Sequence, residues 1–306
     1  MFVGPSRRSA RRVLAAVASL AVLAIPLGTQ VSADARPANK PKPRPSARVN
    51  VWTPAPQATI TPGVMAYTDG SQCTTNFVFT DAVGGVYLGY AAHCAGTGGA
   101  SDTNGCSTTS LPLDTPVSFV RGGSPVVGGT RLGGGTLAYS AWHTMNEIGT
   151  TDGPTCEYND FALVKVGARD VNKVNPSVPF FGGPSGLDTN GVSSGDRLFS
   201  YGNSSLRGGL TALSPKFGFG FGDVAVDAGW SHSLYSLTPG VPGDSGSGFM
   251  SAGGKAVGVL STVVLTPLPL SNNIGDLASE LAFAQKHSGI PGLRLAKGTV
   301  KFRSVI

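Results

Sequence analysis

The sequence predicts an all-β protein, and three observations carry this prediction. The 306 residues include 44 glycines, and only 13% of the residues are charged. From residue 64 onward, short apolar runs alternate with glycine-rich turns. Many short strands joined by glycine turns have this composition, whereas a helical bundle does not. The length allows one large domain or two small ones.

The first 35 residues are typical of a signal peptide. Four arginines between residues 7 and 12 precede an apolar stretch at 13–27, which is short for a membrane span. Ala33-Asp34-Ala35 then offers a cleavage site with small residues at both ends. We therefore predict cleavage after Ala35 and a secreted, extracellular protein. An uncleaved N-terminal anchor is the alternative.

Residues 36–62 form a basic, proline-rich linker or a short pro-segment. They carry basic residues and no acidic ones, and their prolines favour an extended backbone. We interpret the segment as a solvated spacer. Weak attraction to an anionic cell-wall polymer or a membrane surface is the alternative. Residues 63–306 remain as the folded domain.

The positive charge of the chain lies mostly outside this domain. The whole chain has a formal net charge of +6, from 23 basic and 17 acidic residues. Nine of the basic residues and one acidic residue precede residue 63, which leaves residues 64–306 with a net charge of −2. Nucleic-acid binding therefore loses its main support and is not expected.

The most specific chemistry lies in the segment 241–248, Val-Pro-Gly-Asp-Ser-Gly-Ser-Gly. Glycine permits backbone angles that are closed to other residues and lets a ligand approach the main chain. A tight loop here aims the N–H groups of Gly243 and Ser245 at one point, which is the geometry of an oxyanion hole. Ser245 is then a candidate nucleophile, which needs a base and a group that orients the base.

His93 and Asp160 are the candidates for these two roles. His93 follows a hairpin whose second strand is expected at 86–91, and Asp160 opens the apolar run 161–166. A carboxylate at that place is partly buried and needs a partner. His143 is a rival base in principle, but no motif surrounds it, and we interpret it as a surface or strand-end histidine.

Three motifs, Ala-Ala-His93-Cys, Asn-Asp160-Phe-Ala-Leu and Gly-Asp-Ser245-Gly, occur in this order. They resemble the catalytic motifs of the chymotrypsin-like (trypsin-like) serine proteases, which share this order. The resemblance covers roughly residues 64 to 285 and is closest to secreted bacterial members. It implies two six-stranded antiparallel Greek-key β-barrels with the catalytic cleft between them, the first at about 64–175 and the second at about 190–270.

A C-terminal helix is expected at about 273–288. Asn273 is a suitable cap, apolar residues repeat on one face, and Gly289 stops the helix. Such a helix is also usual in the family that the motifs resemble. The residues after 290 continue beyond it, without a functional role that we can assign.

The four cysteines suit two disulfides in an oxidising compartment. Cys73 and Cys94 lie at the two open ends of the predicted hairpin, and the resemblance implies a bridge at the histidine loop as well. Cys106 and Cys156 then pair by elimination. A metal-binding pattern such as Cys-x-x-Cys does not occur in the sequence, and we expect no metal and no cofactor.

The resemblance also places the substrate pocket. It implies that Ser261, Thr262 and Val263 lie beside the substrate and pair with its backbone as an added strand. Pro239 stands where trypsin-like members carry Asp, so cleavage after Arg or Lys is not supported. Val263 falls where many members have Gly. The branched side chain of Val263 narrows the pocket, which favours small apolar substrate residues at the cleavage position.

Asp244 also departs from the family pattern. In animal members the matching carboxylate pairs with a new N-terminus, but an Ile-Val-Gly-Gly-like start is not present in this sequence. A buried Asp244 therefore needs another cation or a set of N–H donors. Arg197 is our candidate for the cation.

These observations predict a secreted serine endopeptidase that acts on protein or peptide substrates as a monomer. His93, Asp160 and Ser245 form its triad and an acyl-enzyme is its intermediate. A secreted binding protein on a protease scaffold, with weak or no proteolytic activity, is the alternative. An α/β-hydrolase that uses Ser245, Asp276 and His287 is disfavoured, because Ser247 breaks the Gly-x-Ser-x-Gly elbow.

Overall fold

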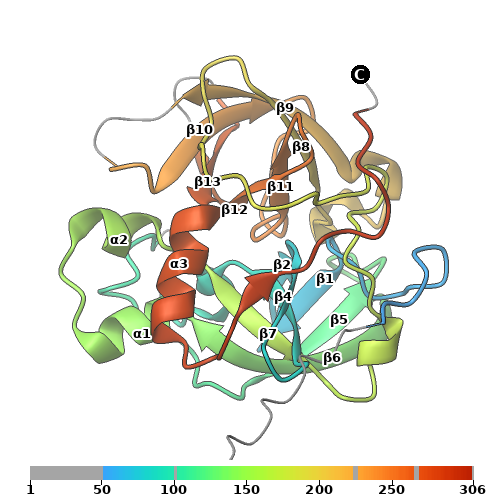
Figure 1. The fold of residues 1–306 in the computed structure, drawn as a ribbon, viewed down its shortest axis with the longest axis horizontal. Helices are drawn as coiled ribbons and strands as arrows, with labels where there is room; N and C mark the ends of the chain where they lie inside the picture. The colour runs from blue at the N-terminus through green and yellow to red at the C-terminus, as the bar shows by residue number, and fades with distance from the viewer. Residues whose placement is uncertain (1–50, 100–101, 223–226, 265–268, 305–306) are drawn as a thin grey trace, which may run out of the picture. The chain divides into compact units, whose positions relative to one another are not determined.

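The short apolar runs, which glycine-rich turns separate in the sequence, fold into two antiparallel sheets (Figure 1). The structure is a computed structural model that describes residues 51–99, 102–222, 227–264 and 269–304. The described residues all fall in one unit, Ser46–Ile306. The predicted signal peptide and residues 36–50 lie outside them. The all-β prediction is confirmed.

The first sheet has eight strands in the order β14-β3-β4-β7-β6-β5-β1-β2. This is two strands more than the six that were expected, and one of the two is β14, with which the chain after the C-terminal helix returns to pair with β3. The strands are β1 (Met65–Thr68), β2 (Ser71–Thr74), β3 (Val78–Thr80), β4 (Val86–Tyr90), β5 (Pro116–Arg121), β6 (Thr130–Ser140), β7 (Ala162–Val166) and β14 (Arg294–Leu295).

The second sheet is a closed barrel of six strands, as expected. It closes because β9 pairs with both β8 and β10. Its last strand extends to residue 276, six residues past the predicted end of the barrel. The strands are β8 (Arg197–Tyr201), β9 (Pro215–Gly222), β10 (Ser231–Ser236), β11 (Gly248–Ser251), β12 (Ala256–Val264) and β13 (Ser271–Asp276).

The C-terminal helix is present but begins later than predicted. Residues 271–276 extend the barrel as β13, and the cap of helix α3 (Leu277–His287) is Asp276, not Asn273. The Asp276 carboxylate accepts a hydrogen bond from the Ser279 N–H at 2.8 Å, which satisfies an N–H group at the helix start. Gly289 follows the helix with a φ of 69°, as a stop residue requires.

Short helices fill the connections. They are α1 (Ala141–Ile148), α2 (Gly153–Tyr158), η1 (Ala92–Ala95), η2 (Val171–Lys173), η3 (Ser205–Arg207) and η4 (Thr211–Leu213). Within the described ranges, no helix is long and apolar enough to cross a membrane.

Both ends of the described chain pack on the sheets. On the N-terminal side Ile60 is fully buried, and its N–H donates to the Lys173 carbonyl at 3.1 Å. After β14 the C-terminal segment continues from the first sheet to the second barrel (Figure 1). There the Phe302 ring packs edge-on against Phe199, with ring centroids 5.4 Å apart. This segment therefore joins the two sheets, a role that the sequence did not indicate.

Two disulfides are present, Cys73–Cys94 and Cys106–Cys156. Their partners are 21 and 50 residues apart in the sequence. The longer loop restricts the unfolded chain more, so its bridge is expected to stabilise the fold more.

We expect the double substitution Cys106→Ala/Cys156→Ala to lower the free energy of unfolding by about 4 kcal/mol, and Cys73→Ala/Cys94→Ala by about 3 kcal/mol. Urea unfolding monitored by tryptophan fluorescence measures both values. An unchanged urea midpoint for the first variant would contradict the role given to the longer loop.

Candidate active site

Strand pairing brings His93 and Asp160 together. β4 and β7 are antiparallel neighbours, with Tyr90 opposite Ala162. His93 follows β4 in the short helix η1, and Asp160 lies two residues before β7. The end of one strand and the start of its antiparallel neighbour lie at the same edge of a sheet. The register of this pair therefore places the histidine beside the carboxylate.

Asp160 is buried, and both of its carboxylate oxygens accept hydrogen bonds. Oδ1 accepts from the His93 backbone N–H at 2.8 Å, and Oδ2 lies 2.7 Å from His93 Nδ1. The Ser261 hydroxyl donates to Oδ2 at 2.6 Å. A buried carboxylate needs such donors to offset the loss of water. The arrangement fixes the imidazole, with Nδ1 on the carboxylate and Nε2 on the other edge of the ring.

The electrostatics of this pair favour a protonated imidazole. Burial lowers the pKa of His93, but the negative charge of Asp160 and its hydrogen bond to the ring outweigh burial and raise the pKa above 6.5. The His93 side chain is 29% exposed, whereas that of Asp160 is 3% exposed. The histidine can therefore reach a substrate while the carboxylate stays behind it.

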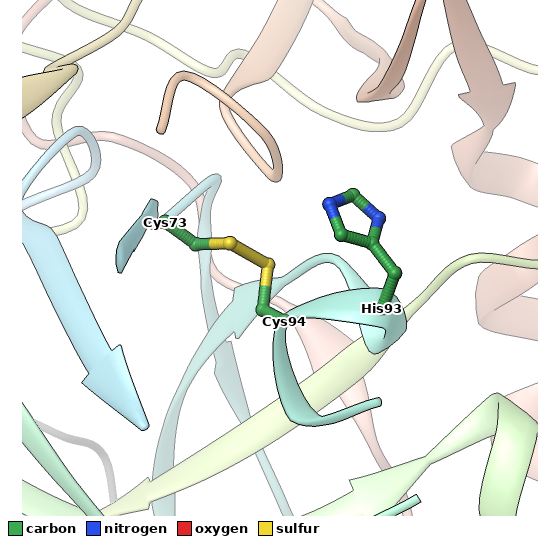
Figure 2. A group of neighbouring side chains, drawn as sticks. All are labelled: Cys73, His93 and Cys94. Atoms are coloured by element: carbon green, nitrogen blue, oxygen red, sulfur yellow. A yellow bond between two sulfur atoms is a disulfide. The ribbon is translucent and has the colours of Figure 1, made fainter. Parts of the chain in front are cut away.

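The Cys73–Cys94 disulfide lies beside the His93 ring (Figure 2). The two sulfur atoms and a ring nitrogen all lie within 4.8 Å of one another, a spacing that a metal site also has. Here each sulfur is bonded to the other sulfur, so neither is a thiolate ligand. The bridge instead ties the histidine loop to β2.

The Ser245 loop is fixed against the same strand β2. The Ser245 carbonyl accepts from the Thr74 N–H at 2.8 Å, and the Gly243 carbonyl accepts from the Thr74 hydroxyl, also at 2.8 Å. Thr74 is next to Cys73, whose partner Cys94 is next to His93. A short series of bonds therefore connects the serine loop with the histidine loop.

Two glycines make this close approach possible. Gly243 and Gly246 have φ angles of 94° and 87°, a region that favours glycine. A Cβ atom on Gly246 would lie 2.5 Å from the Thr74 carbonyl oxygen. The turn therefore requires glycine at positions 243 and 246, and the packing of the loop on β2 requires glycine at position 246.

The N–H groups of Gly243 and Ser245 are available to a ligand. In the described ranges neither group donates a hydrogen bond within the protein, whereas the Asp244 N–H between them donates to the Val241 carbonyl. Free N–H groups on either side of a tight turn are what an oxyanion hole requires. Among the same residues Ser245 Oγ has no hydrogen bond to His93, and such contacts often tighten only when a substrate is bound.

Ser261 has a second role that the sequence did not reveal. The register between β12 and β13 shifts between Leu260 and Thr262, so Ser261 is the extra residue of a β-bulge. A bulge re-aims the side chain at the extra residue. Here the Ser261 hydroxyl reaches Asp160, which lies just before β7 of the first sheet. Sequence patterns do not contain the position of a bulge, so this contact could not be read in advance.

The other predicted pocket residues lie on two neighbouring segments. Asn272 on β13 is fully buried and connects them: its Oδ1 accepts from the Gly240 N–H, and its Nδ2 donates to the Thr262 carbonyl. Gly240 follows Pro239, and Thr262 precedes Val263, which is 42% exposed. The structure therefore brings Pro239, Thr262 and Val263 to the same region. Their role in substrate binding stays a prediction.

The prediction that Arg197 pairs with Asp244 was wrong. Arg197 is exposed at the start of β8, whereas Asp244 Oδ2 lies 2.6 Å from Arg207 Nη2 and 2.9 Å from Lys216 Nζ. Lys216 and Asp244 are both fully buried. Burial lowers the pKa of Lys216, the neighbouring Arg207 lowers it further, and the Asp244 charge opposes both. Basic residues on the short helix η3 and on β9 become partners of Asp244 only in the folded barrel.

The remaining histidines are used elsewhere. His143 Nε2 lies 4.0 Å from Glu147 on helix α1, and buried His232 pairs with Asp276 at 3.1 Å. The His287 ring packs on Phe283 at the far end of helix α3 from Asp276. A triad of Ser245, Asp276 and His287 is therefore excluded, because the helix holds the last two about 16 Å apart.

The structure defines a mostly β protein with one eight-stranded antiparallel sheet and one closed six-stranded barrel, an architecture that resembles the fold of the chymotrypsin-like serine proteases. Family models do not match the sequence, and curated proteins do not match it either.

Solved structures that are similar to this chain include three bacterial proteins. Thermobifida fusca Protease A is 16% identical, with a TM-score of 0.48, over 78% of this chain and 99% of that one. Nocardiopsis protease is 18% identical, with a TM-score of 0.44, over 77% of this chain and 98% of that one. Cellulomonas bogoriensis chymotrypsin is 18% identical, with a TM-score of 0.41, over 78% of this chain and 98% of that one. These likenesses concern the fold alone.

The substitution Asp160→Asn is expected to lower the pKa of His93, because it removes the charge and the hydrogen bond that raise the pKa in the native protein. NMR titration of the imidazole measures both values. The stabilisation by the native pair is present below pH 6.5 and is lost as the pH rises through the raised pKa of His93. An unchanged titration curve would contradict the electrostatic account.

The substitution Asp244→Asn leaves the fully buried Lys216 cation and the partly buried Arg207 cation without a carboxylate. We expect it to lower the free energy of unfolding by about 3–5 kcal/mol, the usual effect of breaking a buried ion pair. Asp69→Asn is the matched control, because Asp69 is exposed. Urea unfolding that gives equal values for the two variants would contradict the importance of the cluster.

Proposed function

We propose that the protein is a serine endopeptidase that hydrolyses peptide bonds through an acyl-enzyme intermediate. Ser245 Oγ attacks the carbonyl carbon of the substrate, and His93 Nε2 accepts the serine proton. His93 then donates this proton to the leaving amine, and a water molecule hydrolyses the acyl-enzyme with His93 again as the base. Asp160 stabilises the imidazolium that forms in each half of the reaction.

The observation that carries this proposal is the pairing of His93 with a buried, fully hydrogen-bonded Asp160. A carboxylate held on Nδ1 selects the tautomer in which Nε2 is free to accept a proton. The Ser245 loop is bonded to β2, which the disulfide joins to the histidine loop, and this supports Ser245 as the partner of that nitrogen.

Stabilisation of the oxyanion is proposed for the N–H groups of Gly243 and Ser245. In the described part of the chain both groups lack an internal acceptor, and the left-handed turn at Gly243 places them on either side of the buried Asp244 N–H. Two preorganised donors cost no reorganisation when charge develops on the substrate oxygen.

The proposed substrates are proteins or peptides that are not cleaved after Arg or Lys. Pro239 offers no carboxylate for a basic side chain, and the Pro239 carbonyl accepts a hydrogen bond from Arg207 at 2.7 Å. A cation beside this position disfavours a second cation in the pocket. The branched side chain of Val263 supports small apolar residues at the cleavage site.

An extracellular location is part of the proposal. Both bridges need an oxidising compartment to form and persist. The predicted signal peptide at residues 1–35 supplies the export route. The spacer predicted for residues 36–62 is shortened to 36–50 in this proposal, because the later residues pack on the domain: the Thr53 N–H donates to the Val174 carbonyl at 3.2 Å, and Ile60 is fully buried.

The mature protein and its Ser245→Ala variant are treated with a fluorophosphonate probe and then assayed for casein hydrolysis. Labelling and hydrolysis are expected only when Ser245 is present, because the probe reacts with an activated serine. Peptide mapping of the cleaved casein then shows whether cuts after Arg and Lys are rare.

The matched control is Ser233→Ala, because the Ser233 hydroxyl donates to Asn273 on the neighbouring strand β13 and not to the Ser245 loop. This variant is expected to label at the native rate. A folded protein with both disulfides that does not label would overturn the enzyme proposal and favour a binding protein on the same scaffold.

A further inference from the structure

A buried carboxyl group lies directly behind the Asp160 backbone. Glu280, on helix α3, is fully buried, and its Oε1 accepts a hydrogen bond from the Asp160 N–H at 3.2 Å. The residue belongs to the C-terminal helix, 120 positions along the chain. It is not used in the mechanism proposed above, and the motifs of the sequence do not include it.

The surroundings of Glu280 contain acids and no partner cation. In the described residues no Lys, Arg or His nitrogen lies within 4.0 Å of its carboxyl oxygens, and the neighbouring Asp276 pairs with His232. The negative charges of Asp160 and Asp276 act on the Glu280 carboxyl group. Tyr139 on β6 is a third titratable neighbour. Within the same residues, Glu280 Oε2 and the Tyr139 hydroxyl have no hydrogen-bond partner.

These surroundings favour the neutral form of the side chain. An unpaired charge in a fully buried place costs far more than an unpaired polar atom. Burial and the charges of Asp160 and Asp276 raise the pKa of Glu280 well above its usual value, and the hydrogen bond from the Asp160 N–H opposes them only in part. Burial without a partner cation therefore favours the protonated form of Glu280.

Two contacts show that the position is built for this group. A Cβ atom on Gly275 of β13 would collide with Glu280 Oε1, so a glycine at this place leaves room for the carboxyl. On the other side of Asp160, its carbonyl accepts from the Ala92 N–H at 3.1 Å. The Asp160 main chain is thus held on one side by the histidine loop and on the other by Glu280.

We propose that Glu280 is a positioning residue for the triad: as a neutral carboxylic acid, it holds the Asp160 backbone through Oε1 and thereby fixes the carboxylate that orients His93. The inference rests on the proposed function only in its effect on catalysis. Placing this acceptor on helix α3 makes the C-terminal helix part of the catalytic apparatus. A neutral group serves here because a second negative charge would repel Asp160.

The first test compares the stability of the native protein and Glu280→Gln as a function of pH. The raised pKa means that the folded state keeps a proton that the unfolded chain releases above its usual pKa of 4.5. The free energy of unfolding of the native protein, minus that of Glu280→Gln, is therefore greatest below pH 4.5. This difference falls as the pH rises toward the raised pKa of Glu280. The ratio of the two unfolding constants changes by on the order of tenfold per pH unit.

The matched control is Glu147→Gln, because Glu147 is an exposed glutamate on helix α1. Its urea unfolding curves are expected to follow those of the native protein between pH 5 and pH 8. Parallel pH dependences for Glu280→Gln and the native protein would overturn the inference, because they would mean that Glu280 is ionised in the folded state.

The second test measures fluorophosphonate labelling of Ser245 and the kcat/KM of peptide hydrolysis. Glu280→Leu removes the acceptor of the Asp160 N–H and is expected to lower both on the order of tenfold or more, through kcat and not KM. Glu280→Gln keeps an acceptor and is expected to restore most of the loss. Equal rates for native protein and Glu280→Leu would overturn the inference.

The two tests separate this inference from the proposed function. A native protein that neither labels nor cleaves overturns the proposed function, whereas the stability comparison needs no activity and still decides the state of Glu280. If Glu280→Leu does not fold, the comparison uses Glu280→Gln and Asp160→Asn. An equal loss of kcat/KM in these two variants would overturn the positioning role.

Discussion

The burial of the Asp160 carboxylate is the constraint on which the rest of the site depends. A charge removed from water must be satisfied by donors, and the donors here come from both halves of the chain. The His93 backbone and ring follow strand β4 of the first sheet, and the Ser261 hydroxyl belongs to the second barrel. The same requirement therefore docks one sheet on the other and orients the imidazole.

The molecule stabilises three buried acids in three different ways. Asp160 is satisfied by a ring, a backbone N–H and a hydroxyl, and Asp244 by the cations of Arg207 and Lys216. Glu280 accepts one backbone N–H and has no partner cation among the described residues, and its burial favours the neutral form. In the proposed mechanism the first arrangement suits a group that stabilises a transient imidazolium, whereas the second anchors the loop that carries Ser245. Differences in local partners therefore give identical carboxyl groups different properties.

Glycine is abundant because the main chain must approach other groups closely. Gly246 lets the Ser245 loop contact β2, and Gly275 leaves room for the Glu280 carboxyl. At these places a side chain would displace the functional group from its partner. The high glycine content that first indicated short strands and turns is thus also a requirement of the site.

The sequence by itself determined the all-β class, the pairing of the cysteines and the candidates His93, Asp160 and Ser245, because these depend on local patterns and on short motifs. Only the tertiary structure decided the partners of the buried charges. Arg207, Lys216, Ser261 and Glu280 reach their carboxyl groups through barrel closure, a β-bulge and the docking of a helix. Their positions depend on strand register and on contacts between distant segments, which local sequence patterns do not encode.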